Sequence, residues 1–195
     1  MGIDKKVKRS RRAVFLDQDG TIIKYVDLLT DPKKVLLLPK AADAIRKMNK
    51  LGFLVLIVTN QPVIARGLIS ESGLEKIENR IVSLLAKKGA KSDGILFCPH
   101  HPEATLKRYR KKCSCRKPEP GMILKAAKKY NINLKKSFMI GDALIDVVAG
   151  HRAGVKSILV KTGPGHERLD KIYRNERPDF KARDLREAVK FICKK

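Results

Sequence analysis

Short apolar runs alternate with segments of helical periodicity along most of this chain. Residues 13–16 read AVFL, a continuous apolar run of the kind found in strands that are covered on both faces. Residues 39–50 instead place apolar side chains three and four positions apart, and Gly52 then marks a helix end. The same criteria predict strands at 13–16, 53–58, 94–98, 137–140 and 155–160, and helices at 39–50, 71–88, 121–130, 142–153 and 185–193.

The regular order of strand and helix predicts an α/β fold with a mostly parallel sheet flanked by helices. At 195 residues, the chain is long enough for one domain with a single core. We assign residues 13–195 to this domain, and residues 1–12, which carry a dense basic block, to a tail. Ligand sites of such sheets lie beyond the carboxyl ends of the strands, so the residues there are the candidates for chemistry.

Composition narrows the expected location of the protein. The hydrophobic share of 43% is typical of a folded soluble protein. No apolar run approaches the roughly 20 residues that a membrane-spanning helix needs, and the first residues do not resemble a signal peptide. We therefore expect a cytoplasmic protein without a membrane partner, in which disulfides are disfavoured.

The charge of the chain is strongly positive, with 44 Lys and Arg against 20 Asp and Glu, a formal net charge of +24. Such an excess is typical of proteins that bind nucleic acids through phosphates. However, the basic residues are spread along the chain, and aromatic side chains for base stacking are few. We therefore do not expect a nucleic-acid partner, although the positive field would also attract a small phosphorylated metabolite.

Polar motifs lie beyond the ends of the predicted strands. Each motif alone is a weak signal, because Asp-x-Asp-Gly is often a turn and Gly-Asp is often a helix start. Their occurrence in this order, each after a strand, is a much stronger indication of a site. The motifs are Asp17-Gln18-Asp19-Gly20-Thr21, Thr59-Asn60-Gln61, Arg116-Lys117-Pro118 and Gly141-Asp142.

These residue types suit phosphoryl transfer. The carboxylates of Asp17 and Asp142 are hard oxygen ligands of the kind that Mg²⁺ prefers. The second oxygen of Asp17 can then attack phosphorus and form an aspartyl-phosphate, while Mg²⁺ and Lys117 neutralise the charge. Thr59 can hold a phosphate oxygen, and Asp19 can protonate the leaving alcohol and later activate water.

Three of the four cysteines lie in the connection 98–117, which we call the zinc loop. A Cys-x-His pair stands at its beginning and a Cys-x-Cys pair stands near its end. Together they offer four ligands, which suit a tetrahedral, structural Zn²⁺ site. Free thiols in a loop are the alternative, and clustering beside histidines argues against it. The predicted zinc ligands are Cys98, His100, Cys113 and Cys115.

His101 is the rival of His100 as the imidazole ligand. We prefer His100 because its spacing from Cys98 equals the spacing within the cysteine pair. Zinc bound here would fix both ends of a long basic loop, and would thereby orient Arg116 and Lys117 toward the phosphate. The predicted role of zinc is therefore structural and not catalytic.

The four strand-end motifs resemble the signatures of the haloacid-dehalogenase-type (HAD) phosphatases. The resemblance implies a Rossmann-like fold and Mg²⁺-dependent phosphoryl transfer, with Asp17 as the nucleophile and Asp19 as the general acid and base. It also implies that Asp17, Asp142 and the backbone carbonyl of Asp19 bind Mg²⁺, while Thr59 and Lys117 hold the phosphate. No insertion between the motifs exceeds the zinc loop, so we expect a minimal cap and a monomer.

The zinc loop and its continuation into Arg116-Lys117 are similar to those of one HAD branch, the heptose bisphosphate and histidinol-phosphate phosphatases. In this branch Asn60 and Arg116 would contact the substrate, a small phosphorylated sugar. The resemblance implies hydrolysis of the 7-phosphate of D-glycero-D-manno-heptose 1,7-bisphosphate, for cell-surface heptose synthesis. A histidinol-phosphate phosphatase is the alternative, and the charge prompts a nucleic-acid 3′-phosphatase as a further one.

Four residues depart from the pattern of this branch and bear on the substrate. Gln18 stands where many relatives have Arg, and Ala143 stands where Lys is frequent. Pro62-Val63 replaces a Ser-Gly that is common in the heptose enzymes. These differences leave the predicted chemistry in place, and the preferred anomer of the sugar stays open.

Overall fold

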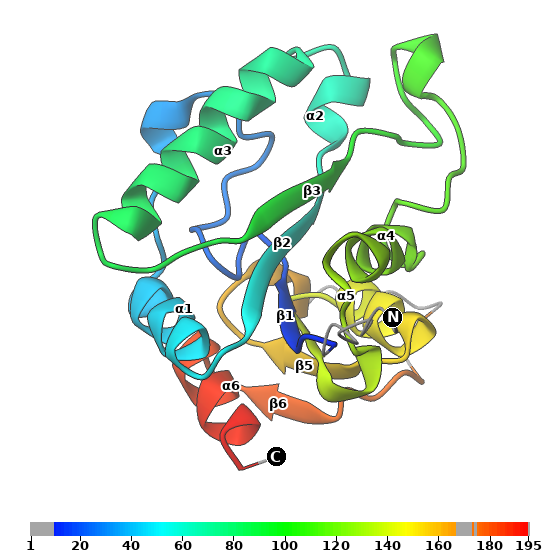
Figure 1. The fold of residues 1–195 in the computed structure, drawn as a ribbon. Coiled ribbons are helices and arrows are strands. Elements are labelled where there is room, and N and C mark those ends of the chain that lie inside the picture. The colour runs from blue at the N-terminus through cyan, green and yellow to red at the C-terminus, as the bar shows by residue number, and fades with distance from the viewer. Residues whose placement is uncertain (1–9, 167–172, 174, 195) are drawn as a thin grey trace, which may run out of the picture.

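A parallel β-sheet of six strands lies at the centre of the protein (Figure 1). The computed structural model describes residues 10–166, 173 and 175–194. Neighbouring strands are parallel throughout, and the order β3-β2-β1-β4-β5-β6 is that of a Rossmann-like sheet, which confirms the predicted fold class. The strands are β1 (Ala13–Leu16), β2 (Leu54–Asn60), β3 (Gly94–Cys98), β4 (Phe138–Gly141), β5 (Lys156–Val160) and β6 (Phe180–Ala182).

Helices cover both faces of this sheet (Figure 1). They are α1 (Ala41–Lys50), α2 (Pro62–Ala65), α3 (Glu71–Ala86), α4 (Gly121–Tyr130), α5 (Leu144–Ala153) and α6 (Leu185–Ile192). Side chains of α1, α3 and α6 form one apolar cluster with the sheet, and side chains of α4 and α5 form a second cluster. The two clusters contain alternate residues of the strands, so the fold has three layers.

Strand β1 shows why its apolar run is continuous. Val14 and Leu16 belong to the cluster of α1, α3 and α6, whereas Ala13 and Phe15 belong to the cluster of α4 and α5. All four side chains are fully buried. Because both faces of the strand are covered, no polar residue is tolerated between its ends.

Two short elements were not predicted from the sequence. Helix α2 has four residues and strand β6 has three, and both are too short to display a periodic pattern. The predicted strand at 53–58 is shifted, because β2 continues to Asn60. Thr59 and Asn60 are therefore the last two residues of the strand and not the beginning of a loop.

The described end of the predicted basic tail is attached to the domain. The backbone of Arg11 bonds to Asn131 and Asn133, and the guanidinium of Arg12 lies 4.4 Å from the ring centre of Phe53. Arg12 also donates to the carbonyl of Leu51 at 3.1 Å. The remainder of the tail, residues 1–9, lies outside the described residues.

The connections between the elements are compact. Residues 17–40 and 99–120 form the two long connections at the carboxyl end of the sheet, and both contain only a 3-10 turn each. This agrees with a minimal cap. No helix in the described part of the chain combines the length and the apolar character that crossing a bilayer requires.

Glu78 is an unusual acidic residue on α3. One of its carboxylate oxygens is buried and has no hydrogen-bond partner among the described residues. Burial raises the pKa of Glu78 to about 7, and the like charge of Glu75, three residues earlier on the helix, adds to this. The ionised form of Glu78 is therefore disfavoured in the folded protein.

We predict that Glu78→Gln stabilises the protein in a pH-dependent manner. The folded-state pKa lies above the ordinary glutamate value of 4.5, so the folded protein loses stability as the pH rises from 4.5 to about 7. Above pH 7 the variant should gain roughly 1 kcal/mol in the free energy of unfolding, less than the full pKa difference implies because Glu78 is partly exposed and solvent screens its charge, and at pH 4 it should gain nothing. Urea unfolding of Glu78→Gln and of Glu103→Gln, an exposed glutamate outside α3 that serves as the control, would measure this, and an equal gain at both pH values would contradict it.

Candidate active site

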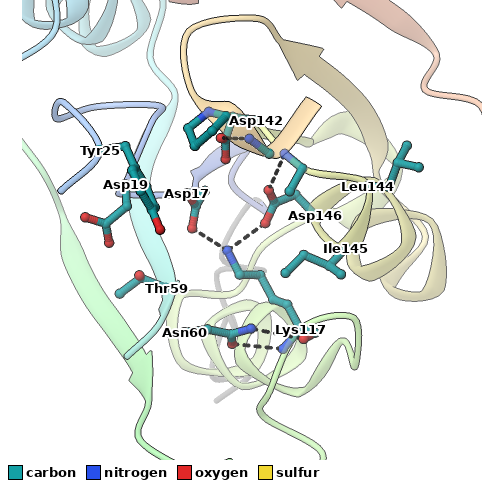
Figure 2. A pocket seen from close by; sticks show the side chains of 13 residues that line it. Asp17, Asp19, Tyr25, Thr59, Asn60, Lys117, Asp142, Leu144, Ile145 and Asp146 are labelled. Atoms are coloured by element: carbon teal, nitrogen blue, oxygen red, sulfur yellow. Dashed lines mark hydrogen bonds and ion pairs between the residues drawn. The ribbon is translucent and has the colours of Figure 1, made fainter. Parts of the chain in front are cut away.

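A pocket of about 300 Å³ opens beyond the carboxyl ends of β1, β2 and β4 (Figure 2). We call it the catalytic pocket. In the sheet, β2 and β3 lie on one side of β1, and β4, β5 and β6 lie on its other side. The chain therefore changes its direction of progress across the sheet between β1 and β4, and α/β sheets of this type bind ligands at that point. The polar residues that line the pocket are Asp17, Asp19, Tyr25, Thr59, Asn60, Lys117, Asp142 and Asp146.

The ammonium group of Lys117 is the centre of this pocket, and its side chain is almost completely buried. It lies 2.5 Å from Oδ1 of Asp17 and 2.6 Å from Oδ1 of Asp146, as Figure 2 shows. It also donates to the backbone carbonyl of Val58 at 2.9 Å. Burial opposes the charged form, but the two carboxylates outweigh this and raise the pKa of Lys117, so the cation is retained.

Asn60 fixes the backbone of Lys117. Its Nδ2 donates to the carbonyl of Lys117 and its Oδ1 accepts from the amide of Lys117, both at 3.0 Å. This two-point contact links the end of β2 to a segment 57 residues away in the sequence. Asn60 also lines the catalytic pocket, so its predicted substrate contact stays a prediction beside this observed positioning contact.

Three carboxylates, those of Asp17, Asp142 and Asp146, can bring oxygen atoms within 4.8 Å of one another. Burial raises the pKa of Asp17 well above its usual range, and the cation of Lys117 opposes this increase. Burial also raises the pKa of Asp142 to about 6. Three acidic groups beside one ammonium leave excess negative charge in a buried place, and a divalent cation between Asp17 and Asp142 would neutralise it.

Glycines surround the carboxylate of Asp142. A Cβ atom at Gly163 would lie 2.2 Å from Oδ2 of Asp142, and a Cβ at Gly20, whose φ is +78°, would lie 2.7 Å from it. The amide of Gly165 donates to the same oxygen at 2.9 Å. These contacts hold Asp142 in one orientation, as expected for a ligand that must meet a metal ion at a fixed place.

Asp19 has a different environment from the other acidic groups of the pocket. Burial raises its pKa to about 6, while hydrogen bonds from Gln61 and Gln18 and the charge of Lys117 lower it in part. This pKa lies close to neutrality, as is favourable for a group that donates and accepts protons in turn. Asp17 is paired with Lys117 and Asp19 is not, and the predicted difference in their roles stays a prediction.

A second pocket of about 270 Å³ adjoins the catalytic pocket and shares Asp19, Tyr25 and Asn60 with it. We call it the arginine pocket, because Arg66 and Arg116 line it. His101 lines it as well. The guanidinium of Arg116 donates to the carbonyl of His100 at 3.0 Å, so it is held in place by the zinc loop.

The four predicted zinc ligands meet in space. Their ligand atoms, the three cysteine sulfurs and Nδ1 of His100, all lie within 4.8 Å of one another. His101 is directed elsewhere, since its Nδ1 accepts from the amide of Glu103 at 3.1 Å. Burial lowers the pKa of His100, so its imidazole is neutral at pH 7, the form that binds metals. This donor set fits a structural zinc ion.

Comparisons with known proteins agree with this geometry. A D-glycero-beta-D-manno-heptose-1,7-bisphosphate 7-phosphatase of Photorhabdus laumondii is 41% identical over 77% of this chain and 81% of its own length. A D-glycero-alpha-D-manno-heptose-1,7-bisphosphate 7-phosphatase of the same organism is 40% identical over 78% and 84%. The family model described as HAD-hydrolase-like matches residues 114–188. This chain belongs to the HAD-like phosphatase family.

A solved structure extends the likeness of this HAD-like phosphatase to nearly the whole chain. The D,D-heptose 1,7-bisphosphate phosphatase of B. bronchiseptica, in complex with magnesium and phosphate, has a TM-score of 0.82 and is 30% identical. The match covers 94% of this chain and 98% of that chain. The protein is therefore an enzyme that hydrolyses phosphate monoesters, as the sequence predicted.

The structure of this HAD-like phosphatase brings most of the predicted site residues together. Arg116 lies in the adjoining arginine pocket instead of the catalytic pocket. Sequence reasoning gave no role to Asp146, Gln61 or Tyr25. For Asp146 a signal existed, because it follows Asp142 by four residues and so lies in the first turn of α5, close to the carboxyl end of β4. The predicted site residues that line the catalytic pocket are Asp17, Asp19, Thr59, Asn60, Lys117 and Asp142.

We predict that Asp146→Asn lowers the kcat of this HAD-like phosphatase about 10- to 100-fold, because Lys117 loses one of its two carboxylate partners. The asparagine oxygen can still accept from the amide of Ala143, so α5 should begin normally. Turnover of p-nitrophenyl phosphate and the melting temperature would be measured together. Asp43→Asn, which affects only the exposed pair with Arg46, is the matched control, and unchanged turnover in Asp146→Asn would contradict the prediction.

Proposed function

We propose that this protein is a Mg²⁺-dependent phosphatase that removes the 7-phosphate from D-glycero-D-manno-heptose 1,7-bisphosphate. The observation that carries this proposal is the junction of the two pockets. A nucleophilic carboxylate lies in one pocket, two arginines lie in the other, and Asp19 and Asn60 line both. A sugar with two phosphates suits this arrangement, and the names of the relatives support it.

In the first step, Asp17 attacks the phosphorus atom of the 7-phosphate. A bond forms between a carboxylate oxygen of Asp17 and phosphorus, and the bond between phosphorus and the sugar oxygen breaks. Asp19 donates its proton to that sugar oxygen, which leaves as an alcohol. Lys117 lies beside the attacking carboxylate and neutralises part of the charge that would otherwise repel the phosphate.

In the second step, Asp19 removes a proton from a water molecule. The water oxygen bonds to the phosphorus of the aspartyl-phosphate, and inorganic phosphate leaves from Asp17. Thr59 lies at the end of β2, where its hydroxyl and backbone amide can hold a phosphate oxygen during both steps. Thr59 and Lys117 thus bind the phosphoryl group that is transferred. Asp17 and Asp19 carry out the bond formation and the proton transfers.

Mg²⁺ would be held by carboxylate oxygens of Asp17 and Asp142 and by the backbone carbonyl of Asp19. When bound, it supplies positive charge that neutralises the phosphate and keeps both carboxylates ionised. The excess of buried carboxylates and the glycines around Asp142 support this assignment.

We further propose a structural Zn²⁺ ion bound by Cys98, His100, Cys113 and Cys115. The cluster joins the end of β3 to the segment that enters the catalytic pocket, and Gly121, the first residue of α4, bonds to the carbonyl of Ser114. Metal binding would therefore fix the path of the chain on both sides of Lys117. A monomeric state, a cytoplasmic location and the absence of a nucleic-acid partner stay predictions.

The substrate assignment predicts a clear order of activities. With Mg²⁺ present, release of phosphate should be fastest from one anomer of heptose 1,7-bisphosphate, and at least about 10-fold slower from histidinol phosphate and a 3′-phosphorylated oligonucleotide. Steady-state kcat/KM values for both anomers and the two other substrates would measure this. Asp17→Asn should abolish turnover while the melting temperature shows that the fold is kept. A preference for either of the other substrates would replace the proposed substrate.

Removal of zinc provides a separate test. Metal analysis should find about one zinc per chain, and Cys115→Ser should lose both the zinc and most of the activity while the sheet stays folded. Cys193→Ser is the matched control, because this exposed cysteine lies outside the cluster and should retain zinc and turnover. If zinc-free protein keeps full turnover with Mg²⁺ restored, the proposed role of the cluster is wrong.

A further inference from the structure

The chain has only two glutamines, Gln18 and Gln61, and both donate to the same carboxylate oxygen. Nε2 of Gln18 lies 3.3 Å from Oδ2 of Asp19, and Nε2 of Gln61 lies 3.1 Å from the same atom. Both glutamine side chains are buried, and Gln18 is completely inaccessible to solvent. They reach Asp19 from two different elements, because Gln18 follows β1 and Gln61 precedes α2.

Gln61 makes a second contact that links Asp19 to the phosphate-binding residue. Its Nε2 also donates to the hydroxyl oxygen of Thr59 at 3.0 Å, so both hydrogens of this amide are used. Because Thr59 accepts this hydrogen bond, its own hydroxyl hydrogen remains for a phosphate oxygen. The side-chain amide of Gln61 therefore orients both Asp19, which would act on the leaving sugar oxygen, and Thr59, which would hold the phosphate.

The other oxygen of Asp19 has no such partner. Oδ1 is buried and lacks a hydrogen bond to any described residue, although Asp19 lines both pockets. A carboxyl oxygen that accepts two N–H bonds is a poor place for a proton, since the proton would displace the donors. Oδ1 is therefore the oxygen of Asp19 that is left to meet a substrate.

We propose that Gln18 and Gln61 are positioning residues that hold Asp19 through Oδ2 and so reserve Oδ1 to deliver the proton to the leaving oxygen. This inference rests on the proposed phosphatase function and adds the atom that performs its proton transfer. Amide groups suit the task because they orient the carboxyl group without adding a charge, whereas a cationic donor would favour the ionised form and oppose proton donation.

A structural role alone would also explain why two buried amides have hydrogen-bond partners. The two roles differ in how they depend on the leaving group. Proton donation matters most for a leaving group that is a strong base, and little for p-nitrophenolate, which leaves without help. A loss of packing would instead lower the rates for all substrates by the same factor.

The test uses Gln18→Met and Gln61→Met, which remove the N–H donors at similar volume, with a series of substituted phenyl phosphates. Because kcat/KM reports only the steps up to formation of the aspartyl-phosphate, it isolates the acid role of Asp19. We expect kcat/KM to fall about 30-fold or more for unsubstituted phenyl phosphate, and less than about 5-fold for p-nitrophenyl phosphate. Gln61→Met should also raise the KM for every member of the series, since Thr59 loses its partner.

Asp19→Asn provides the background that assigns the effect. In this background Gln18→Met should cause no further change in the ratio of the two kcat/KM values, because residue 19, to which the Gln18 side chain donates in the described structure, can no longer act as an acid. Leu85→Met, a change of similar volume at a fully buried residue that lines neither pocket, is the control for packing and should leave the ratio unchanged. Gln18→Asn and Gln61→Asn, whose shorter amides cannot reach Asp19, replace any methionine variant that unfolds.

The outcomes separate this inference from the function on which it rests. If the wild-type protein with Mg²⁺ hydrolyses none of the phenyl phosphates, the phosphatase function itself fails. If the wild type hydrolyses the whole series and the glutamine variants lose the same factor on every member, the positioning role is overturned. A ratio that changes with the leaving group, and does so only when Asp19 is present, supports it.

Discussion

The buried ammonium of Lys117 between Asp17 and Asp146 is the interaction on which the rest of the site depends. A lone lysine in such a place would be costly, and loss of both carboxylate partners would leave an uncompensated buried charge. Asp17 comes from the end of β1, Asp146 from the first turn of α5, and the lysine from a long connection between β3 and α4. The ammonium therefore joins three segments that lie far apart in the sequence, and the correct geometry of the nucleophile is inseparable from the correct fold.

The sheet and the zinc loop contribute to this interaction in different ways. Parallel strands bring the ends of β1, β2 and β4 together without any help from the loop, because each strand is buried on both faces and its register is fixed. The backbone of Lys117 has no such support, and it is held by the side chain of Asn60 on one side. The cysteine cluster lies just before it in the chain and would supply the second support once metal is bound. A rigid sheet thus provides the carboxylates, and local contacts position the cation against them.

Much of this site could be predicted from the sequence because its acidic groups stand directly beyond apolar runs. Asp17, Asp19 and Asp142 follow strands whose patterns are unambiguous, and the spacing of the cysteines is short enough to predict a cluster. The contacts of Asn60, Gln18 and Gln61 could not be predicted in this way. An amide at a strand end can face the substrate or a neighbouring backbone, and only the three-dimensional path of residues 98–118 shows that Asn60 meets Lys117. Elements as short as α2 and β6 were missed for a related reason, since tertiary contacts and not periodicity determine them.

The distribution of charge reconciles a very basic protein with an acidic site. The catalytic pocket holds four aspartates and one lysine, so its local field repels a phosphate unless a divalent cation is present. The chain as a whole nevertheless carries a net charge of +24, and Arg66 and Arg116 line the arginine pocket next to this site. The net charge thus favours a phosphorylated substrate, whereas its approach to Asp17 would depend on the proposed Mg²⁺. Asp19, which is oriented by neutral amides instead of cations, remains able to carry a proton within this field, and that combination is what a leaving alcohol requires.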